Sequence, residues 1–242
     1  MIDIKDLIKN RYAQDSDLKK SFDMPVSISK RILRKSCRKF KKSKISKEIL
    51  ISLIASAQAA PSKSNLQQYS ILLIKNKEMK NQLSKLLRKT AWALEAPLFF
   101  LFLADIRRNK IITEHKGYEY KNNSIDYFMN AVIDASLAMQ NLINSAEEFG
   151  LGICPISMVR NYLEEVKKMC QLPEGVFPIA GLSVGWPDEN NEVSIRLPMK
   201  VVFHEDFYND KDMLKQIDHY DKTIECLQPI PKSKQRHVNV YG

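Results

Sequence analysis

The chain has 242 residues, of which 44% are hydrophobic and 27% charged, and its 38 basic and 28 acidic residues give a net charge of +10. This is the size and composition of a globular protein with a substantial core. No apolar run approaches the roughly 20 residues that span a bilayer, which excludes a helical membrane protein. The N-terminus has early acidic residues and no apolar signal segment, so we expect a cytoplasmic protein.

The first elements are read from capping signals and apolar spacing. A short helix is expected over residues 29–35, leading into a basic run at residues 31–44. Ser46 is predicted to cap a second helix, whose apolar residues recur at helical spacing. After a polar loop, a buried strand is expected over residues 69–74 and an amphipathic helix over residues 77–89.

The middle of the chain is predicted to form the core. The run PLFFLFLAD, residues 97–105, is typical of a central strand buried on both faces. Residues 124–149 carry apolar side chains around nearly the whole helix, which ends at Gly150. A helix that is apolar on all sides is buried on all sides, either in the core or against a partner subunit.

The remaining elements complete an α+β pattern. They are a strand at residues 153–156, a helix at 160–170, a strand at 177–186 and a last helix at 211–225, followed by a basic tail.

Several common sites are excluded. The seven glycines form neither a Rossmann fingerprint nor a P-loop, and G-x-S-x-G is absent. The four cysteines are scattered and the four histidines lack metal-site spacing, which predicts reduced thiols that pack as small apolar groups, and no metal. His204 could act as a base, although a surface or packing role is favoured.

Two polar loops remain unexplained. The first, LRKSCRKF at residues 33–40, suits either a phosphate or a solvated run of charge. The second, APSKSNLQQ at residues 60–68, suits either a planar heterocycle with a ribityl chain or a plain turn. The side chains concerned are Arg34, Lys35, Ser36 and Arg38 in the first loop, and Ser62, Ser64, Asn65 and Gln67 in the second.

Taken together, RKSCRKF and APSKSNLQ resemble the flavin-binding signature of the nitroreductase family. The stretches DASLAMQNLINSAEEFGLGICPI and LPEGVFPIAGLSVGWPDE follow in the family's order. RLPMKVVFHEDFY is similar to the oxygen-insensitive NADPH nitroreductase and flavin reductase branch. The resemblance covers residues 31–208.

The resemblance implies an α+β nitroreductase-like fold, with a central mixed β-sheet surrounded by helices. It also implies an obligate homodimer with FMN sites at the subunit interface and the helix at residues 124–149 as its central interface helix. The chain would divide into an N-terminal helical arm (1–30), an FMN-binding domain (31–208), and a C-terminal helix and tail (209–242) that pack on the partner subunit.

The resemblance also assigns residues to non-covalently bound FMN, with no protein catalytic residue because flavin N5 carries the chemistry. Arg38 is expected beside the pyrimidine side of the ring. The phosphate and ribityl end would be held by Arg34, Lys35, Ser36 and Arg196. The ring and ribityl chain would be lined by Ser62, Ser64, Asn65 and Gln67, with the serines coming from the partner subunit. The N5 edge would be lined by Ile156, Ser157 and Met158.

Two positions depart from the family pattern. Lys35 stands where arginine is usual, and Ser194 stands where the NADPH branch has a lysine. A lysine lacks the bidentate fork of an arginine.

The function implied is an FMN-dependent NAD(P)H oxidoreductase that passes electrons to nitroaromatic, quinone or flavin acceptors in a ping-pong cycle. One alternative is a flavin reductase that supplies reduced FMN to a partner, and another is a flavin-binding protein without turnover. A rival of a different class is a nucleic-acid-binding protein that uses residues 31–44. The main hypothesis expects neither nucleic acid nor membrane as a partner.

Overall fold

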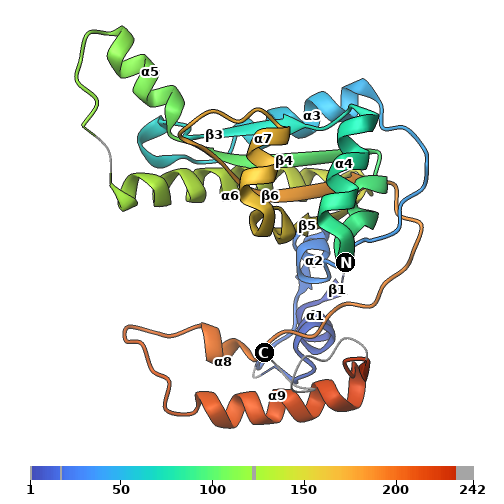
Figure 1. Ribbon diagram of the computed structural model, residues 1–242. Coiled ribbons are helices and arrows are strands. Elements are labelled where there is room, and N and C mark those ends of the chain that lie inside the picture. The colour runs from blue at the N-terminus through green and yellow to red at the C-terminus, as the bar shows by residue number, and fades with distance from the viewer. Residues whose placement is uncertain (1, 17, 122–123, 233–242) are drawn as a thin grey trace. The chain divides into compact units, whose positions relative to one another are not determined.

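The computed structural model describes residues 2–16, 18–121 and 124–232 (Figure 1). It divides into two compact units, one formed by residues 36–191 and the other by residues 1–35 together with 192–242. The basic tail expected after the last helix lies mostly outside the described residues. Within them, no helix is both long and apolar enough to cross a membrane.

The unit of residues 36–191 is built on a four-stranded sheet with the order β3-β4-β6-β5. Its strands are β3 (Tyr69–Leu73), β4 (Leu98–Asp105), β5 (Gly152–Ile156) and β6 (Val176–Gly185). Each of the three described pairings is antiparallel. The strands β3 and β5 are therefore the two edges of the sheet.

The central strand β4 confirms the prediction from PLFFLFLAD, since all eight of its residues are buried. Its side chains alternate between two cores, as the period of a strand requires. Phe100 and Phe102 face one cluster of buried residues, and Phe99 and Leu101 face the other. Both faces of the sheet are thus covered by helices.

One face is covered by α3 (Lys47–Gln58) and α6 (Ile125–Glu148). As predicted, Ser46 caps α3, its hydroxyl accepting the Ile49 N–H at 3.3 Å. The buried residues of α6 include Ala131, Ala135 and Ala138, and such small side chains let a helix lie close to a sheet. The helix is consequently a fixed support for any side chain it carries.

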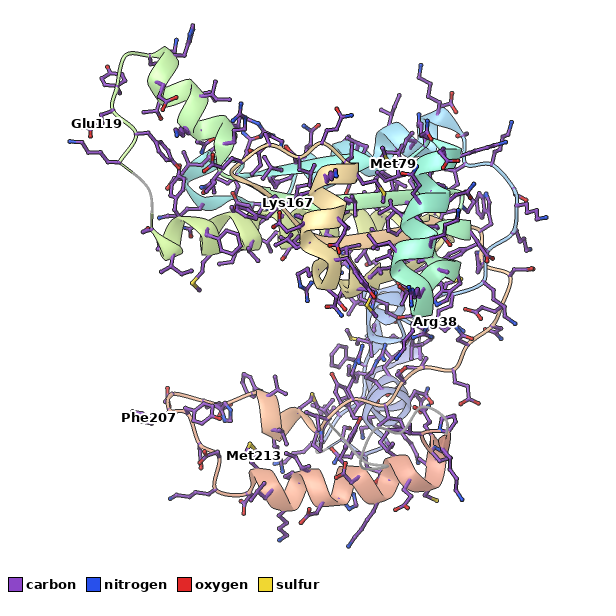
Figure 2. The ribbon with its side chains drawn as sticks, viewed as in Figure 1. Arg38, Met79, Glu119, Lys167, Phe207 and Met213 are labelled. Carbon is purple, nitrogen blue, oxygen red and sulfur yellow. The ribbon has the colours of Figure 1, made fainter. Side chains whose placement is uncertain are left out.

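The opposite face is covered by α4 (Lys77–Leu87), the 3₁₀ segments η2 (Arg88–Glu95) and η3 (Ser157–Tyr162), and α7 (Leu163–Met169). A further helix, α5 (Arg107–His115), follows β4 directly and was not predicted. Figure 2 marks Glu119 on the long connection between α5 and α6.

The long helix α6 is not covered on all sides within one chain. Ile125, Met129, Ile133 and Leu137 are 74%, 54%, 50% and 38% exposed. Residues four apart lie on one face of a helix, so these side chains form a single apolar stripe. We expected this helix to be buried either in the core of the chain or against a partner subunit. The core of the chain buries only part of its circumference, and the apolar stripe is exposed.

The other unit contains the two-residue strands β1 (Ile2–Asp3) and β2 (Asp23–Met24), and the helices α1 (Ile4–Tyr12), α2 (Val26–Ile32), α8 (Met199–Val202) and α9 (Met213–Leu227). The helix predicted at residues 29–35 is α2, which begins and ends about three residues earlier. Its start is set by Pro25, whose carbonyl accepts the N–H groups of Ile28 and Ser29. Figure 2 marks Phe207 on the connection between α8 and α9, where its side chain is 83% exposed.

Candidate functional site

Residues 36–40 of the first polar loop run beside the start of β5. The Cys37 N–H donates to the Ile153 carbonyl at 2.9 Å, and Phe40 forms a β-bridge with Pro187. Cys37 is buried, whereas Arg38, labelled in Figure 2, is exposed. This part of the basic loop therefore has a backbone fixed by hydrogen bonds and a cationic side chain, Arg38, that is exposed to solvent.

Glu189 binds the backbone of the same loop. Its carboxylate accepts the N–H groups of Arg38 and Lys39, and the Asn191 side chain donates both to this carboxylate at 2.7 Å and to the Ser36 carbonyl at 2.8 Å. Desolvation by burial raises the pKa of Glu189, but the hydrogen bonds from Arg38, Asn191 and Lys39 together outweigh it and leave that pKa below its ordinary value. The loop is thus held by an ionised carboxylate that the sequence analysis did not identify.

A glycine allows the basic loop to approach β5 this closely. A Cβ added at Gly152 would lie 2.6 Å from the Cys37 Cβ and 2.7 Å from its Sγ. Such distances are shorter than real side chains tolerate, so only glycine fits at this position without a shift of the loop.

In the other unit, Arg11 joins two of the residues predicted for the phosphate. Arg11 is 5% exposed, and its guanidinium donates to the carbonyls of Ile32, Arg34 and Ser194. Its own carbonyl accepts the Arg196 N–H at 2.9 Å. Arg34 and Arg196, 162 positions apart, are consequently brought into one neighbourhood. No sequence signal distinguishes Arg11 from the other basic residues of its helix.

The second polar loop has an unusual backbone. It contains the 3₁₀ turn η1 (Lys63–Asn65), and φ is +50° at Ser64, +55° at Asn65 and +49° at Gln67. Left-handed φ values are disfavoured for residues other than glycine, and a serine and a glutamine in this region are uncommon. The side chains of Ser64, Asn65 and Gln67 are exposed, so their polar groups can reach a ligand.

Two charged residues hold this loop by its backbone. Asp134, on α6, accepts the Lys63 N–H and the Gln68 N–H, each at 3.0 Å. Arg108, on α5, donates to the Gln67 carbonyl at 3.1 Å and to the Tyr69 carbonyl at 2.9 Å. A pocket of about 290 Å³, lined in part by Gln67 and Arg108, opens here.

The third predicted segment follows the end of β5. Ile156 is the last residue of that strand and is buried, Ser157 is exposed, and Met158 is half-buried at the start of η3. Because residues 36–40 lie beside the start of β5, this strand connects the basic loop with the segment predicted for the N5 edge. A strand of five residues rises about 13 Å from first to last Cα, which separates the charged end from the uncharged end.

Within one chain, the two polar loops do not meet. The basic loop lies beside β5, whose Ile153 pairs with Val184 of β6, while the second loop leads into β3 at the opposite edge of the sheet. Tyr69 of β3 pairs with Ala104, which in turn pairs with Phe177 at the other end of β6. The seven-residue interval from Phe177 to Val184 spans about 24 Å along the strand, apart from the distance across the sheet.

The described residues contain no group of three or more His, Cys, Asp and Glu side chains that could hold a metal ion. His204 packs on the Tyr208 ring with ring centroids 4.7 Å apart, as expected for a packing role. Cys37 and Cys154 are buried, but Cys226 is exposed on α9, so the expectation that the cysteines pack as small apolar groups is wrong for that residue.

Comparison with known proteins gives a consistent result. Residues 33–186 match the model of the nitroreductase family. The chain is 38% identical over 194 residues to "FMN reductase (NADPH)" of Bacillus subtilis (strain 168), covering 78% of each chain. It is 36% identical over 182 residues to "CR(VI) reductase" of Pseudomonas sp. (strain G-1), covering 75% of each chain.

Solved structures of the same kind are also similar. The NfrA1 nitroreductase of B. subtilis superposes with a TM-score of 0.79 at 37% identity, covering 82% of each chain. The NADPH:FMN oxidoreductase of Vibrio harveyi, complexed with NAD+, superposes with a TM-score of 0.77 at 31% identity, covering 82% of this chain and 84% of that one.

Proposed function

This chain belongs to the nitroreductase family, and from that membership we propose that its two polar loops are the halves of an FMN site shared between two copies of the chain. The chain is an FMN-dependent NAD(P)H oxidoreductase. The observation that carries the shared site is the distance between the loops, because β3 and β5 are opposite edges of the sheet.

The donor groups of the two loops fit FMN. An anionic phosphate requires cations and hydroxyl donors, which the basic loop offers in Arg34, Lys35 and Ser36, together with Arg196. An uncharged ring with a ribityl chain requires neutral donors and acceptors, and the exposed side chains of the second loop are of this kind. Bound FMN would supply the redox chemistry, which is hydride acceptance from NAD(P)H at N5 and two-electron reduction of a second substrate.

The chain's own groups bind and orient the cofactor. Arg38 would hold the pyrimidine side of the ring, where its positive charge would favour the reduced, anionic form. The backbone N–H groups of residues 156–158 line the N5 edge, and Ser62, Ser64, Asn65 and Gln67 contact the ring and ribityl chain. Each charge-assisted hydrogen bond contributes about 1.5–3 kcal/mol, so several such contacts retain FMN without a covalent link.

The apolar stripe of α6 supports the homodimer. Four exposed apolar residues spaced by four on one helix are an unusual feature for a surface in contact with water, and a second copy of the chain would cover them. We expect Ile133→Glu to yield a monomer in sedimentation analysis and to abolish FMN retention. Ile133→Leu, which keeps the surface apolar, serves as the matched control and should remain a dimer that retains FMN.

The assignment of FMN is tested on the purified protein. We expect a yellow protein with flavin absorbance, which oxidises NADPH or NADH when an acceptor is added. A protein that is colourless and stays so after incubation with FMN would exclude the proposal. Arg38→Ala should weaken FMN binding roughly tenfold. Lys222→Ala, an exposed lysine on α9, should leave FMN binding unchanged.

Flavin reduction is the second candidate activity, since two of the relatives bear the names "FMN reductase (NADPH)" and "FMN reductase [NAD(P)H]". Comparing turnover with nitrofurazone and with free FMN as acceptors separates a nitroreductase from a flavin reductase.

Two further expectations are part of the same proposal. The cationic residues near the start of the domain serve FMN and not a nucleic acid, so duplex DNA should neither bind in a salt-dependent manner nor compete with FMN. A cytoplasmic location is tested by cell fractionation.

A further inference from the structure

We propose that Asp134 and Arg108 are positioning residues of the flavin site: they hold residues 63–68 in a conformation that is left-handed at Ser64, Asn65 and Gln67 and from which these three side chains reach the cofactor. This inference rests on the proposed FMN site but adds to it two residues that bind the loop and not the ligand.

The loop needs such support because its own residues do not favour its shape. Three of the four residues from Ser64 to Gln67 have positive φ, and none of them is a glycine. In an L-residue this conformation brings Cβ against the following carbonyl, so a free loop of this sequence would leave it. Strained backbone of this kind persists only where the surrounding structure fixes it.

Asp134 supplies the first fixed point. It is 1% exposed and lies on α6 among alanines that pack against the sheet. One carboxylate oxygen accepts the Lys63 N–H and the other accepts the Gln68 N–H, both at 3.0 Å. Lys63 precedes the first left-handed residue and Gln68 follows the last, so a single side chain ties the two ends of the strained segment.

Arg108 supplies the second fixed point from α5. Its guanidinium donates to the Gln67 carbonyl at 3.1 Å, to the Tyr69 carbonyl at 2.9 Å and to the Ser70 hydroxyl at 2.7 Å. The Asp105 carboxylate, 3.2 Å away, orients the guanidinium. The planar fork of an arginine can serve several acceptors at once, which a lysine ammonium does with less definition.

Gln67 is the residue on which these contacts converge. Arg108 fixes its carbonyl, and Asp134 fixes the N–H of the peptide that follows it. The neighbouring Asn109 side chain lies within 3.4 Å of the Leu66 carbonyl. The backbone of Gln67 is therefore defined on both sides while its side chain is exposed, which is the arrangement required of a residue that orients a ligand.

The contacts distinguish positioning from general stability. Asp134 binds only backbone N–H groups of the loop segment, and Arg108 binds the loop together with the first two residues of the edge strand β3. The packing of α6 on the sheet depends instead on its buried alanines, Leu142 and Ile143. Loss of either contact should loosen the loop and leave the sheet intact. Amide hydrogen exchange reports this directly, because the Lys63 and Gln68 amides should exchange faster while those of Phe100 and Phe102 in β4 remain protected.

The experiment uses Asp134→Asn in the full chain, with Asp15→Asn as the matched control. The Asp15 side chain is 90% exposed, and its carboxylate forms a solvent-exposed ion pair with the Lys9 ammonium at 3.6 Å. An asparagine at 134 keeps the size of the side chain but presents an NH₂ group to one of the two N–H donors. We expect the dissociation constant of FMN, measured by flavin fluorescence, to rise roughly tenfold in Asp134→Asn. It should stay within twofold of the parent protein in Asp15→Asn.

Arg108→Lys is a second variant that tests the same proposal independently if Asp134→Asn does not fold. This variant keeps the charge and loses the fork, and we expect FMN to bind roughly fivefold more weakly. At saturating FMN, both variants should show a lower kcat with an unchanged KM for NADPH. The loosened loop orients the flavin ring less precisely for hydride transfer, whereas the surface of the flavin that the nicotinamide binds is the same.

The outcomes separate this inference from the proposed function. If the parent protein binds FMN and both variants bind it within twofold, the positioning role is wrong and the FMN site stands. If the parent protein does not bind FMN, the proposed function is wrong. In that case, unchanged exchange of the Lys63 and Gln68 amides in the variants would also overturn the anchoring of the loop.

Discussion

Replacing Gly152 with alanine would add one methyl group where the start of β5 meets the basic loop. The new Cβ would lie 2.6 Å from the Cys37 Cβ and 2.7 Å from its Sγ, about 0.8 Å inside the ordinary contact distance of 3.4 Å. Backbone φ at Gly152 is not in the left-handed region, so the collision is the only cost. The loop would move away from β5 and lose the 2.9 Å hydrogen bond from Cys37 to Ile153.

The magnitude follows from two known effects. Overpacking a close contact costs about 1–3 kcal/mol, and a lost backbone hydrogen bond costs about 0.5–1.5 kcal/mol. We expect the free energy of unfolding in urea to fall by about 2–4 kcal/mol. Because Ser36 and Arg38 flank Cys37, FMN affinity should fall with it, roughly tenfold.

Two further variants distinguish the steric clash with Cys37 from the backbone strain that replacing a glycine can cause. Gly117→Ala has no neighbour within 4 Å but a φ of +79°, so it carries backbone strain alone, about 1 kcal/mol, and should leave FMN affinity unchanged. Adding Cys37→Gly to Gly152→Ala removes both colliding atoms and should recover part of the loss. Stability and FMN affinity equal to those of the parent protein in Gly152→Ala would refute the close approach of the loop to β5.

Arg11→Ala should leave three backbone carbonyls without their donor and lower the free energy of unfolding by about 3 kcal/mol, as measured in urea, with Arg11→Lys recovering only part of it. Because hydrogen bonds hold the pKa of Glu189 below its ordinary value, its ionised form adds stability at neutral pH that is lost as the pH falls through the lowered pKa. Glu189→Gln should therefore be less stable than the parent protein at pH 7, and calorimetry should show the two melting temperatures converging below about pH 4. Burial raises the pKa of the Cys37 thiol, so iodoacetamide at pH 8 should modify the exposed Cys226 first, as mass spectrometry of the peptides would show; faster labelling of Cys37 would contradict its burial.

The elements with a strong periodic or continuous pattern were predictable from the sequence. The eight buried residues of β4 and the capping of α3 by Ser46 agree with the prediction because burial and capping each leave a local signal. The helix α2 was misplaced because its start depends on Pro25 and not on the apolar residues used to locate it. The helix α5 was missed because its sequence, RRNKIITEH, is mostly polar.

The candidate site was predictable only where residues resemble a family signature. The two loops were found because their residue types recur in order. The residues that hold those loops, Arg11, Glu189, Asp134 and Arg108, were not found. Each is a single charged residue, and its contacts with the loop lie far away in sequence, from 21 to 183 positions for Arg11 and 66 or 71 for Asp134. Such pairings leave no local pattern.

The division of the chain has a consequence for its synthesis. One unit is a continuous segment, residues 36–191, while the other joins residues 1–35 to residues from 192 onward. The first 35 residues leave the ribosome first, pair among themselves through β1 and β2, and must wait for the residues from 192 onward to complete their unit. At about 5–20 residues per second, the intervening 156 residues take roughly 8–30 s to be translated, and the sheet is complete only when β6, near their end, has been made. Until then Arg11 has no Ser194 carbonyl to bind, so the neighbourhood of Arg34 and Arg196 is completed only after the sheet has formed. A nascent chain arrested when residues up to 191, but not the residues that follow, have emerged from the ribosome should therefore contain the folded sheet next to an N-terminal segment that a protease can still cut.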